Sequence, residues 1–444
     1  MYATEDDEQS PNNNSHLVWV PFEEFEDVKK IGQGGFSKIF KATWKFSKKI
    51  NYKGTVKRSS KQKIVLKVLN NSQNVDTEFL NELKHTFQFR SYNIIKCYGV
   101  TQYPQTKNYA FVLEYIPNGD LHHFIHKNFE EFTWKSKIHY LYSIVVGIKN
   151  IHDKKIIHRD LHSGNILAKK NINDIIGNND SRTVISDLGF SQPANIDLKI
   201  SRESQIYGII PYMAPELFKY QPYSYASDIY SLGMIMWQMT SGHKPFHDQE
   251  HGPKLILDIL DGKRPEITED TPERWSNLMK RCWHPNPSQR PTIQEIFIIL
   301  EIINYYTNYP EDFIKKYHPH KYDIWLEFNK AEKKRLEMVE SKNPFVKNPG
   351  YEHPNSRYYS TPLNSMLESI NSTASDLYNL LSNDHFDIMD FNPDQKNNFE
   401  NSDHNLRADN SKKHFLNELL QEENIEDQND FKRRKFFEYF NECL

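Results

Sequence analysis

The first third of the chain alternates short apolar runs with turns, a pattern typical of β-strands. Strand signals cover residues 31–44, which include a glycine turn, and then residues 64–69 and 109–115. The basic, Ser- and Lys-rich stretch 45–63 reads as a surface insertion between strands. Residues 77–88 predict one helix, because their apolar side chains recur at near-helical spacing.

Helical periodicity dominates from Leu121 onward. The strongest apolar helices are predicted at residues 138–152, 227–241 and 293–306. Strands first and helices later indicate an α+β fold with segregated layers. The chain then becomes more polar, and residues 311–341 read as one or two charged helices.

These patterns divide the chain into four parts. We expect a disordered leader over residues 1–24, one folded domain over 25–306, a helical extension over 307–342, and an Asn-rich polar tail, mostly disordered, over 343–444. Apolar residues make up 37% of the chain, below the roughly 45–50% of typical globular proteins. The polar tail is the natural source of this shortfall.

Charge and cysteine content narrow the function classes. The formal net charge is −3, so no global basic field favours nucleic acid. Cys97, Cys282 and Cys443 are scattered and form no CxxC pair, which indicates a reducing compartment. The N-terminus lacks the basic and apolar regions of a signal peptide, and no apolar run approaches the ~18 residues of a membrane span. From these absences we expect a cytoplasmic location.

A glycine-rich hairpin is predicted between the first two strands. Its residues are Gly32, Gln33, Gly34, Gly35, Phe36, Ser37, Lys38 and Ile39. Glycines let backbone N–H groups approach phosphates closely, although an ordinary glycine hairpin has the same pattern and Ser37 stands in the third glycine position. The loop leads into a strand, which argues against a dinucleotide fingerprint, since that motif opens a helix.

Lys67 lies on the strand predicted at residues 64–69. A solvent-facing strand lysine is the ordinary interpretation. The functional alternative is a point charge on nucleotide phosphates, and this role needs a carboxylate to hold the ammonium. Glu82 on the following helix is the candidate, with Glu78 as its rival.

The most specific motif spans residues 156–167: Ile156-Ile157-His158-Arg159-Asp160-Leu161-His162-Ser163-Gly164-Asn165-Ile166-Leu167. It matches H-R-D-L-x-x-x-N at every specified position. Downstream follow Asp187-Leu188-Gly189 and then Ala214-Pro215-Glu216. With these motifs in this order, residues 25–306 resemble the eukaryotic protein kinase superfamily. Arg281-Cys282-Trp283 and Arg290-Pro291-Thr292 most resemble its tyrosine-kinase-like group.

The resemblance implies a two-lobed fold, with a small β-rich N-lobe that carries one key helix and a larger helical C-lobe. It implies transfer of the ATP γ-phosphate to protein substrates. Asp160 would orient the substrate hydroxyl and accept its proton, and Asn165 and Asp187 would bind Mg²⁺ through hard oxygen ligands. Lys67 and Glu82 complete the implied catalytic set.

The resemblance also implies an adenine site between the lobes. Apolar side chains would sandwich the base: Ile31, Ile39, Val65, Leu113 and Leu167. The linker of Glu114, Tyr115 and Ile116 would offer backbone hydrogen bonds. Plain core packing also accounts in part for the apolar residues.

Other matching positions are structural in the family. Glu216 would pair with Arg290, Asp228 would brace the catalytic loop, and His158 would pack in the core. Regulation is a separate hypothesis: a phosphate on the loop between Asp187 and Glu216 could pair with Arg159. The candidates are Ser201, Ser204 and Tyr207, with Ser204 best placed by family spacing.

Departures from the family pattern bear on specificity. His162 stands where Ser/Thr kinases usually carry Lys, Gly208-Ile209 where they carry Gly-Thr, and Tyr212 where tyrosine kinases place Trp. We favour a Ser/Thr-specific signalling kinase, with dual specificity as the alternative. A pseudokinase scaffold, which Ser37 and His162 keep open, and a small-molecule kinase are further alternatives.

The C-terminal tail carries one basic, aromatic stretch. Residues 431–440 combine Lys432, Arg433, Arg434 and Lys435 with aromatic side chains. This stretch could bind a partner or an acidic surface, whereas a short solvated helix is the simpler interpretation.

Overall fold

A computed structural model describes residues 18–35, 37–51, 55–73, 89, 91–172, 182–189, 191–193 and 206–370. Several predictions lie outside these residues. They include the helix at 77–88 with Glu78 and Glu82, Phe36, the two loop serines Ser201 and Ser204, and the tail from residue 371 with its basic, aromatic stretch.

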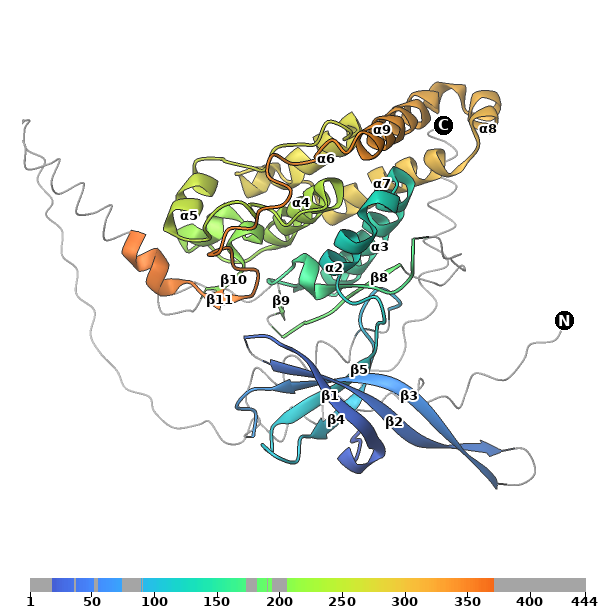
Figure 1. Ribbon diagram of the computed structural model, residues 1–444, viewed down its shortest axis with the longest axis vertical. Coiled ribbons are helices and arrows are strands. Elements are labelled where there is room, and N and C mark those ends of the chain that lie inside the picture. The colour runs from blue at the N-terminus through green and yellow to red at the C-terminus, as the bar shows by residue number, and fades with distance from the viewer. Residues whose placement is uncertain are drawn as a thin grey trace, which may run out of the picture. The chain divides into compact units, whose positions relative to one another are not determined.

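A five-stranded antiparallel sheet forms the N-terminal lobe, in the order β1-β2-β3-β5-β4 (Figure 1). The strands are β1 Phe25–Gln33, β2 Ser37–Asn51, β3 Thr55–Leu69, β4 Cys97–Gln102 and β5 Tyr109–Glu114. Side chains alternate between the two faces of a strand. One face of β3 buries Ile64, Leu66 and Val68 in an apolar core, so the opposite face is left to present Lys67.

Residues 45–51 and 55–63 continue the sheet. The prediction of a separate insertion is wrong for these residues, because β2 and β3 remain in register from Ser37↔Leu69 out to Asn51↔Thr55. Backbone pairing needs no apolar pattern, so polar strands can extend beyond the apolar core.

The sheet also incorporates residues ahead of the predicted boundary at residue 25. Val20 is 1% exposed, its N–H donates to Val100 O at 2.9 Å, and Val100 N–H donates to Val18 O at 3.0 Å. A 3-10 turn, η1 Phe22–Glu24, then leads into β1. Residues 18–24 are therefore ordered, with Val18 and Val20 hydrogen-bonded to the sheet, in contrast to the leader expected there.

Helices build the C-terminal lobe, which confirms the predicted α+β, two-lobed fold. The helices are α2 Leu121–Asn128, α3 Trp134–Asp153, α4 Tyr225–Ser241, α5 Pro253–Leu260, α6 Glu273–Cys282, α7 Ile293–Asn308, α8 Glu311–Tyr317 and α9 Tyr322–Glu340. Most of α3 and α4 is buried in one large apolar core. Gly233 lets α4 approach the end of α6, where an added Cβ would lie 3.0 Å from Cys282 Cβ.

Short strands and 3-10 turns shape the surface that faces the sheet. The strands are β6 Ile156–Ile157, β7 Ile166–Ala168, β8 Thr183–Ile185, β9 Gln192–Pro193, β10 Tyr207–Gly208 and β11 Thr361–Pro362, and the turns include η3 Ser163–Asn165 and η5 Pro215–Lys219. They pair as β6 with β9, β7 with β8, and β10 with β11. The first two pairs position the loops of the candidate site.

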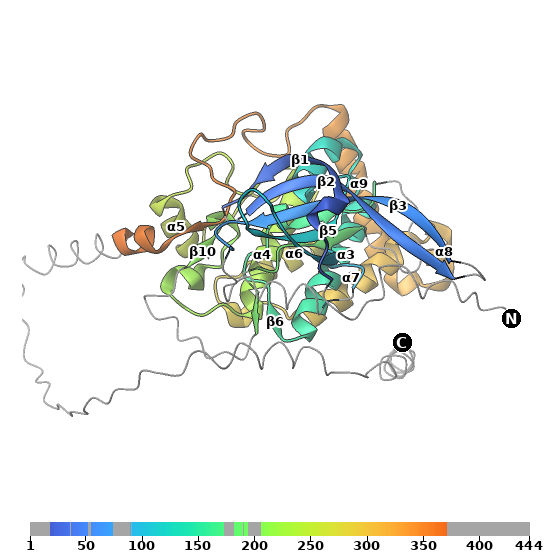
Figure 2. The ribbon, with the colours of Figure 1, turned by 90° about the horizontal axis from the view of Figure 1, so that it is seen from below.

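After α9 the chain returns across the helical lobe and reaches β10 in both views (Figures 1 and 2). We call residues 345–370 the returning segment. Leu363 and Leu367 are 1% and 2% exposed, and Phe345 contacts the Phe129 ring. The expectation of a mostly disordered tail from residue 343 therefore does not hold for these residues, because scattered apolar side chains and backbone pairing fix them.

Candidate active site

The glycine-rich turn joins β1 to β2. Gly34 N–H donates to Ser37 O at 2.8 Å, and Gly32 and Gln33 pair with Ile39 and Lys38 across the hairpin. Ser37 is 7% exposed, so it serves as a buried strand residue in the third glycine position. The hairpin thus keeps its backbone turn without a glycine there.

Lys67 reaches from the sheet to the helical lobe. Its ammonium lies 2.8 Å from Asp187 Oδ1, and the lysine side chain is 9% exposed. The predicted partner Glu82 and its rival Glu78 lie outside the described residues. The structure therefore brings Lys67 to one of the predicted metal ligands and leaves the choice of a glutamate as a prediction.

Of the residues predicted to enclose adenine, Ile39, Val65 and Leu113 lie on the face of the sheet that carries Lys67. Leu167 lies in β7 of the helical lobe. Val65 of β3 pairs with Leu113 of β5, and both are half-buried, as are Ile39 and Leu167. Ile31 is 51% exposed. Side chains that line a ligand site stay partly accessible, whereas pure core residues would be fully covered.

The linker after β5 is fixed at its two ends. Glu114 N–H donates to Lys96 O at 2.9 Å, and its carboxylate lies 3.2 Å from Lys169 Nζ. Gly119 N–H donates to Ile116 O at 3.3 Å, and the Ile116 side chain is buried. Lys41 Nζ holds the hydroxyl of Tyr115 at 3.0 Å.

The catalytic loop is braced from below by Asp228 of α4. Its carboxylate accepts the backbone N–H groups of His158 at 2.8 Å and Arg159 at 3.0 Å, and His152 Nε2 lies 2.9 Å away. Burial acts to raise the pKa of Asp228, but the hydrogen bond with His152 and the charges around it hold the pKa below its ordinary value. The predicted brace is thus present, and His158 is fully buried, as predicted.

Asp160 and Asn165 meet at the end of this loop. Asn165 Nδ2 donates to Asp160 O at 2.9 Å and lies 3.5 Å from Asp160 Oδ2. This orientation leaves the Asn165 amide oxygen as an acceptor. His162 Nε2 lies 3.7 Å from Asp160 Oδ2, while its Nδ1 accepts the Gly164 N–H.

The pKa of Asp160 lies below its ordinary value. Burial acts to raise it, but the neighbouring His162 imidazole and the hydroxyl of Ser360 favour the carboxylate. An ionised carboxylate that accepts a hydroxyl is the state a general base requires.

Asp187 adopts a left-handed backbone conformation, with φ of 60°. Such a conformation is unfavourable for a residue with a side chain and is often found at functional sites. Ser186 N–H anchors the turn on Asn165 O at 2.8 Å. Asn165 directly precedes β7, and Asp187 follows its partner strand β8. An amide oxygen and a carboxylate are a donor set that would fit Mg²⁺.

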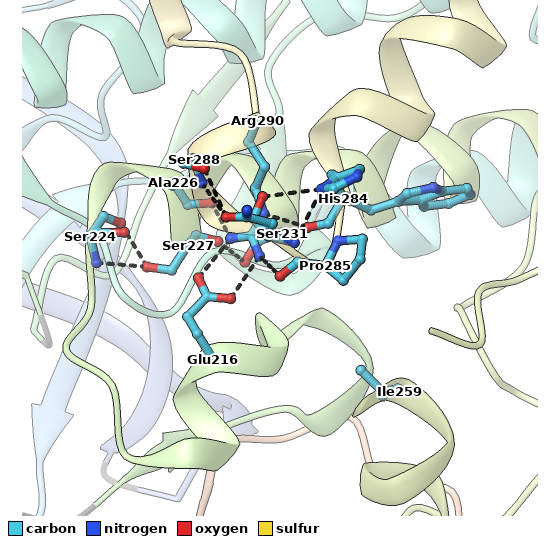
Figure 3. A network of polar contacts seen from close by, with 12 residues as sticks. Glu216, Ser224, Ala226, Ser227, Ser231, Ile259, His284, Pro285, Ser288 and Arg290 are labelled. Atoms are coloured by element: carbon cyan, nitrogen blue, oxygen red, sulfur yellow. Dashed lines mark hydrogen bonds and ion pairs between the residues drawn. The ribbon is translucent and has the colours of Figure 1, made fainter. Parts of the chain in front are cut away.

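Glu216 and Arg290 form a buried ion pair (Figure 3). Arg290 Nη1 and Nη2 donate to the two Glu216 oxygens at 2.7 and 2.6 Å. The pairing was predicted from the family pattern. It fixes η5, which follows the loop that carries β10.

The regulatory hypothesis concerns Arg159, whose φ is 72°. Its guanidinium stacks 4.2 Å from the centre of the Tyr223 ring, and burial lowers its pKa. Tyr207 lies in β10, whereas Ser201 and Ser204 are outside the described residues. Pairing of Arg159 with a phosphate stays a prediction.

Sequence reasoning missed Ser360. Its Oγ donates to both carboxylate oxygens of Asp160, at 2.8 and 2.7 Å. The residue lies 200 positions from Asp160 in a stretch read as disordered, and no local motif marks it. The available signal was Leu363 and Leu367, which follow Pro362 at helical spacing.

Comparison with known families identifies this architecture. The model of the family described as protein tyrosine and serine/threonine kinase matches residues 25–300. The chain belongs to this family.

Similar curated proteins align over the same part of the chain. A probable serine/threonine-protein kinase of Dictyostelium discoideum is 27% identical over 293 residues, 64% of this chain and 20% of that protein. A putative serine/threonine-protein kinase/receptor of Acanthamoeba polyphaga mimivirus is 30% identical over 304 residues (67% and 16%), and a dual specificity protein kinase of D. discoideum is 29% identical over 296 residues (64% and 12%). The aligned part thus spans only 12–20% of these relatives.

Within the described residues, none of the helices combines the length and the apolar character needed to cross a membrane.

Proposed function

We propose that this chain is a protein kinase that transfers the ATP γ-phosphate to serine or threonine hydroxyls of protein substrates in signalling. The observation that carries the proposal is the convergence of four predicted residues from separate segments. Lys67 reaches Asp187 from the sheet, while Asn165 connects Asp160 to the turn that carries Asp187. All four side chains that a pseudokinase would be expected to lose are present.

Each residue has a role that follows from its position. Asp160 would accept the proton of the attacking hydroxyl, since its carboxylate already accepts a hydrogen bond from the Ser360 hydroxyl. Lys67 would hold the nucleotide phosphates, with Glu82 as the proposed second carboxylate. Mg²⁺, held by Asn165 and Asp187, would neutralise charge that develops on the transferred group. The glycine hairpin from Gly32 would cover the phosphates.

Serine or threonine is favoured over tyrosine by the distance from backbone to base. In the returning segment, Thr361 pairs with Gly208 of β10, and the short side chain of the adjacent Ser360 then reaches Asp160. A tyrosine held on the same backbone would carry its hydroxyl past the carboxylate. The similarity to named Ser/Thr kinases also supports this choice, while the similarity to a dual specificity kinase keeps that alternative open.

Protein substrates and ATP are the proposed partners, and nucleic acid is not. We also propose closeness to the tyrosine-kinase-like group and a reducing, cytoplasmic location; the proposal of a reducing compartment follows from the scattered cysteines. Partner binding by residues 431–440 remains a proposal drawn from composition.

The test is transfer of label from γ-labelled ATP with Mg²⁺ to a generic protein substrate, followed by phosphoamino-acid analysis. Asp160→Asn should lower turnover by about 10²–10⁴-fold, because it removes the base and little volume. Asp153→Asn is the matched control, since Asp153 lies exposed at the end of α3. Label on serine or threonine that is lost only in Asp160→Asn supports the proposal. A wild-type chain that transfers no label, even after treatment with an activating kinase, would indicate a pseudokinase.

A further inference from the structure

The returning segment is docked on the helical lobe at both ends. Upstream, Arg357 N–H donates to His251 Nδ1 at 2.9 Å and the Tyr358 hydroxyl donates to Pro245 O at 2.9 Å. Downstream, Leu363 is buried and its N–H donates to Ile206 O at 2.8 Å. Ser360 therefore lies between two fixed points.

Backbone pairing fixes the position of Ser360 relative to the catalytic loop. β11 pairs antiparallel with β10 through Thr361↔Gly208 and Pro362↔Tyr207. Adding a strand to a short exposed edge is a common way to bind an extended peptide, because main-chain hydrogen bonds give affinity without demanding a sequence. The segment is thus held as an added strand on β10, with Ser360 beside the catalytic loop.

The site encloses Ser360 from the other side as well. A Cβ added to Gly35 would lie 3.2 Å from Ser360 O, so the glycine hairpin lies close to the backbone of this residue. The Ser360 hydroxyl donates to both oxygens of Asp160, at 2.8 and 2.7 Å. This serine is consequently the hydroxyl presented to the proposed base.

We propose that Ser360 is a phosphorylation site of the chain's own kinase domain, modified within the same molecule; this inference rests on the proposed function. Ser360 Oγ forms a bond to the γ-phosphorus of ATP while the bond from that phosphorus to the β–γ bridging oxygen breaks. ADP leaves with the electron pair of that bond. The hydroxyl proton passes to Asp160.

The presence of the hydroxyl distinguishes a substrate from a permanent inhibitor. A segment that only blocked the active site would do so with any small side chain. It would not need a hydroxyl that donates to the carboxylate of Asp160. After transfer, a dianionic phosphate would stand beside the Asp160 carboxylate, and this repulsion would favour release of the segment. The unmodified segment therefore also limits access of other substrates.

The experiment uses the full chain, treated with a phosphatase that is then removed, and γ-labelled ATP with Mg²⁺. Peptide mapping should place label on Ser360, and Ser360→Ala should remove that labelled peptide. Ser365→Ala is the matched control, since Ser365 is exposed four residues after Thr361. A generic protein substrate in parallel reports the proposed function independently.

Modification within one molecule has a kinetic signature. The fraction of Ser360 labelled at early times should not change when the chain is diluted, because the acceptor is held at the site. Full-length Asp160→Asn chain mixed with wild type should gain little label at Ser360. Labelling that falls in proportion to dilution would overturn the intramolecular step.

Leu363→Lys tests the docking. It should slow labelling of Ser360 and raise transfer to a generic peptide, since a buried apolar anchor becomes charged. Transfer to the generic substrate with no label on Ser360 would overturn the inference and leave the proposed function intact. Absence of label from both would count against both.

Discussion

Arg290 ties several segments together with one buried guanidinium. Beyond its two hydrogen bonds to Glu216, its Nε donates to His284 O, and Nη1 donates to Ala226 O, at 2.8 and 2.9 Å. The planar fork matches the carboxylate and the carbonyls at once, and its side chain is fully buried. A lysine could serve only part of this set.

We expect Arg290→Lys to lower the free energy of unfolding by about 2–4 kcal/mol, because buried acceptors and half of the Glu216 carboxylate lose their donors. Denaturant unfolding measures the change. Arg281→Lys, at an exposed position of α6, is the control and should have almost no effect. Equal stability of the two variants would show that the bidentate geometry contributes little.

At the residue scale, motif spacing named four residues that the structure connects through hydrogen bonds and an ion pair. Asp160, Asn165, Asp187 and Lys67 were named from motifs that resemble those of protein kinases, and their catalytic roles stay predictions. Ser360 could not be named, since its contact with Asp160 depends on tertiary docking of a segment whose sequence resembles linker. The Lys67–Asp187 contact was also unforeseen, because strand alternation shows which face Lys67 takes but not what it meets.

Helix α3 carries a buried charge that no motif suggested. Lys137 is fully buried, 3.8 Å from Asp270 Oδ2 and over the Trp134 ring at 4.4 Å. Burial lowers the pKa of Lys137 from 10.5 to about 8, although Asp270 opposes the shift. Keeping Lys137 charged in the folded chain therefore lowers the free energy of unfolding.

The lowered pKa of Lys137 predicts how the stability of the folded chain depends on pH. Between pH 8 and 10 the unfolded chain keeps the proton of Lys137 while the folded chain loses it, so folded stability should rise with pH. Relative to Lys137→Met, wild type should gain at most about 3 kcal/mol over this range, at ~1.4 kcal/mol per pKa unit. Unfolding of wild type, Lys137→Met and the exposed-site control Lys135→Met at each pH gives the comparison. Parallel curves for wild type and Lys137→Met would contradict the prediction.

At the element scale, apolar periodicity found the buried helices well. The prediction of residues 138–152 falls within α3, and that of 227–241 within α4. Periodicity is informative there because burial imposes it. The β2–β3 extension and β11 depend on backbone hydrogen bonds, which leave no such trace in the sequence, so both were missed.

On the scale of the whole molecule, the chain adds helices beyond the part that the family model matches. Helix α9 packs on the start of α3: Glu332 accepts the Trp134 N–H at 2.8 Å, and Arg335 Nη1 donates to Glu130 O at 2.7 Å. Phe328 of α9 is 3% exposed and meets the Trp134 ring edge-on at 6.2 Å. These contacts indicate that α9 belongs to the same cooperative unit as the helical lobe.

If α9 unfolds together with the helical lobe, Phe328→Ala should lower the free energy of unfolding of the whole lobe. We expect a loss of about 3–5 kcal/mol, because removing a buried phenyl ring leaves a cavity against Trp134. Unfolding followed by tryptophan fluorescence and by far-UV circular dichroism should shift together to lower denaturant, without a second transition. Leu336→Ala is the control on the same helix, since Leu336 is 43% exposed and should change stability little. An early, separate loss of helical signal, with the main midpoint unchanged, would instead mean that α9 unfolds independently of the kinase domain.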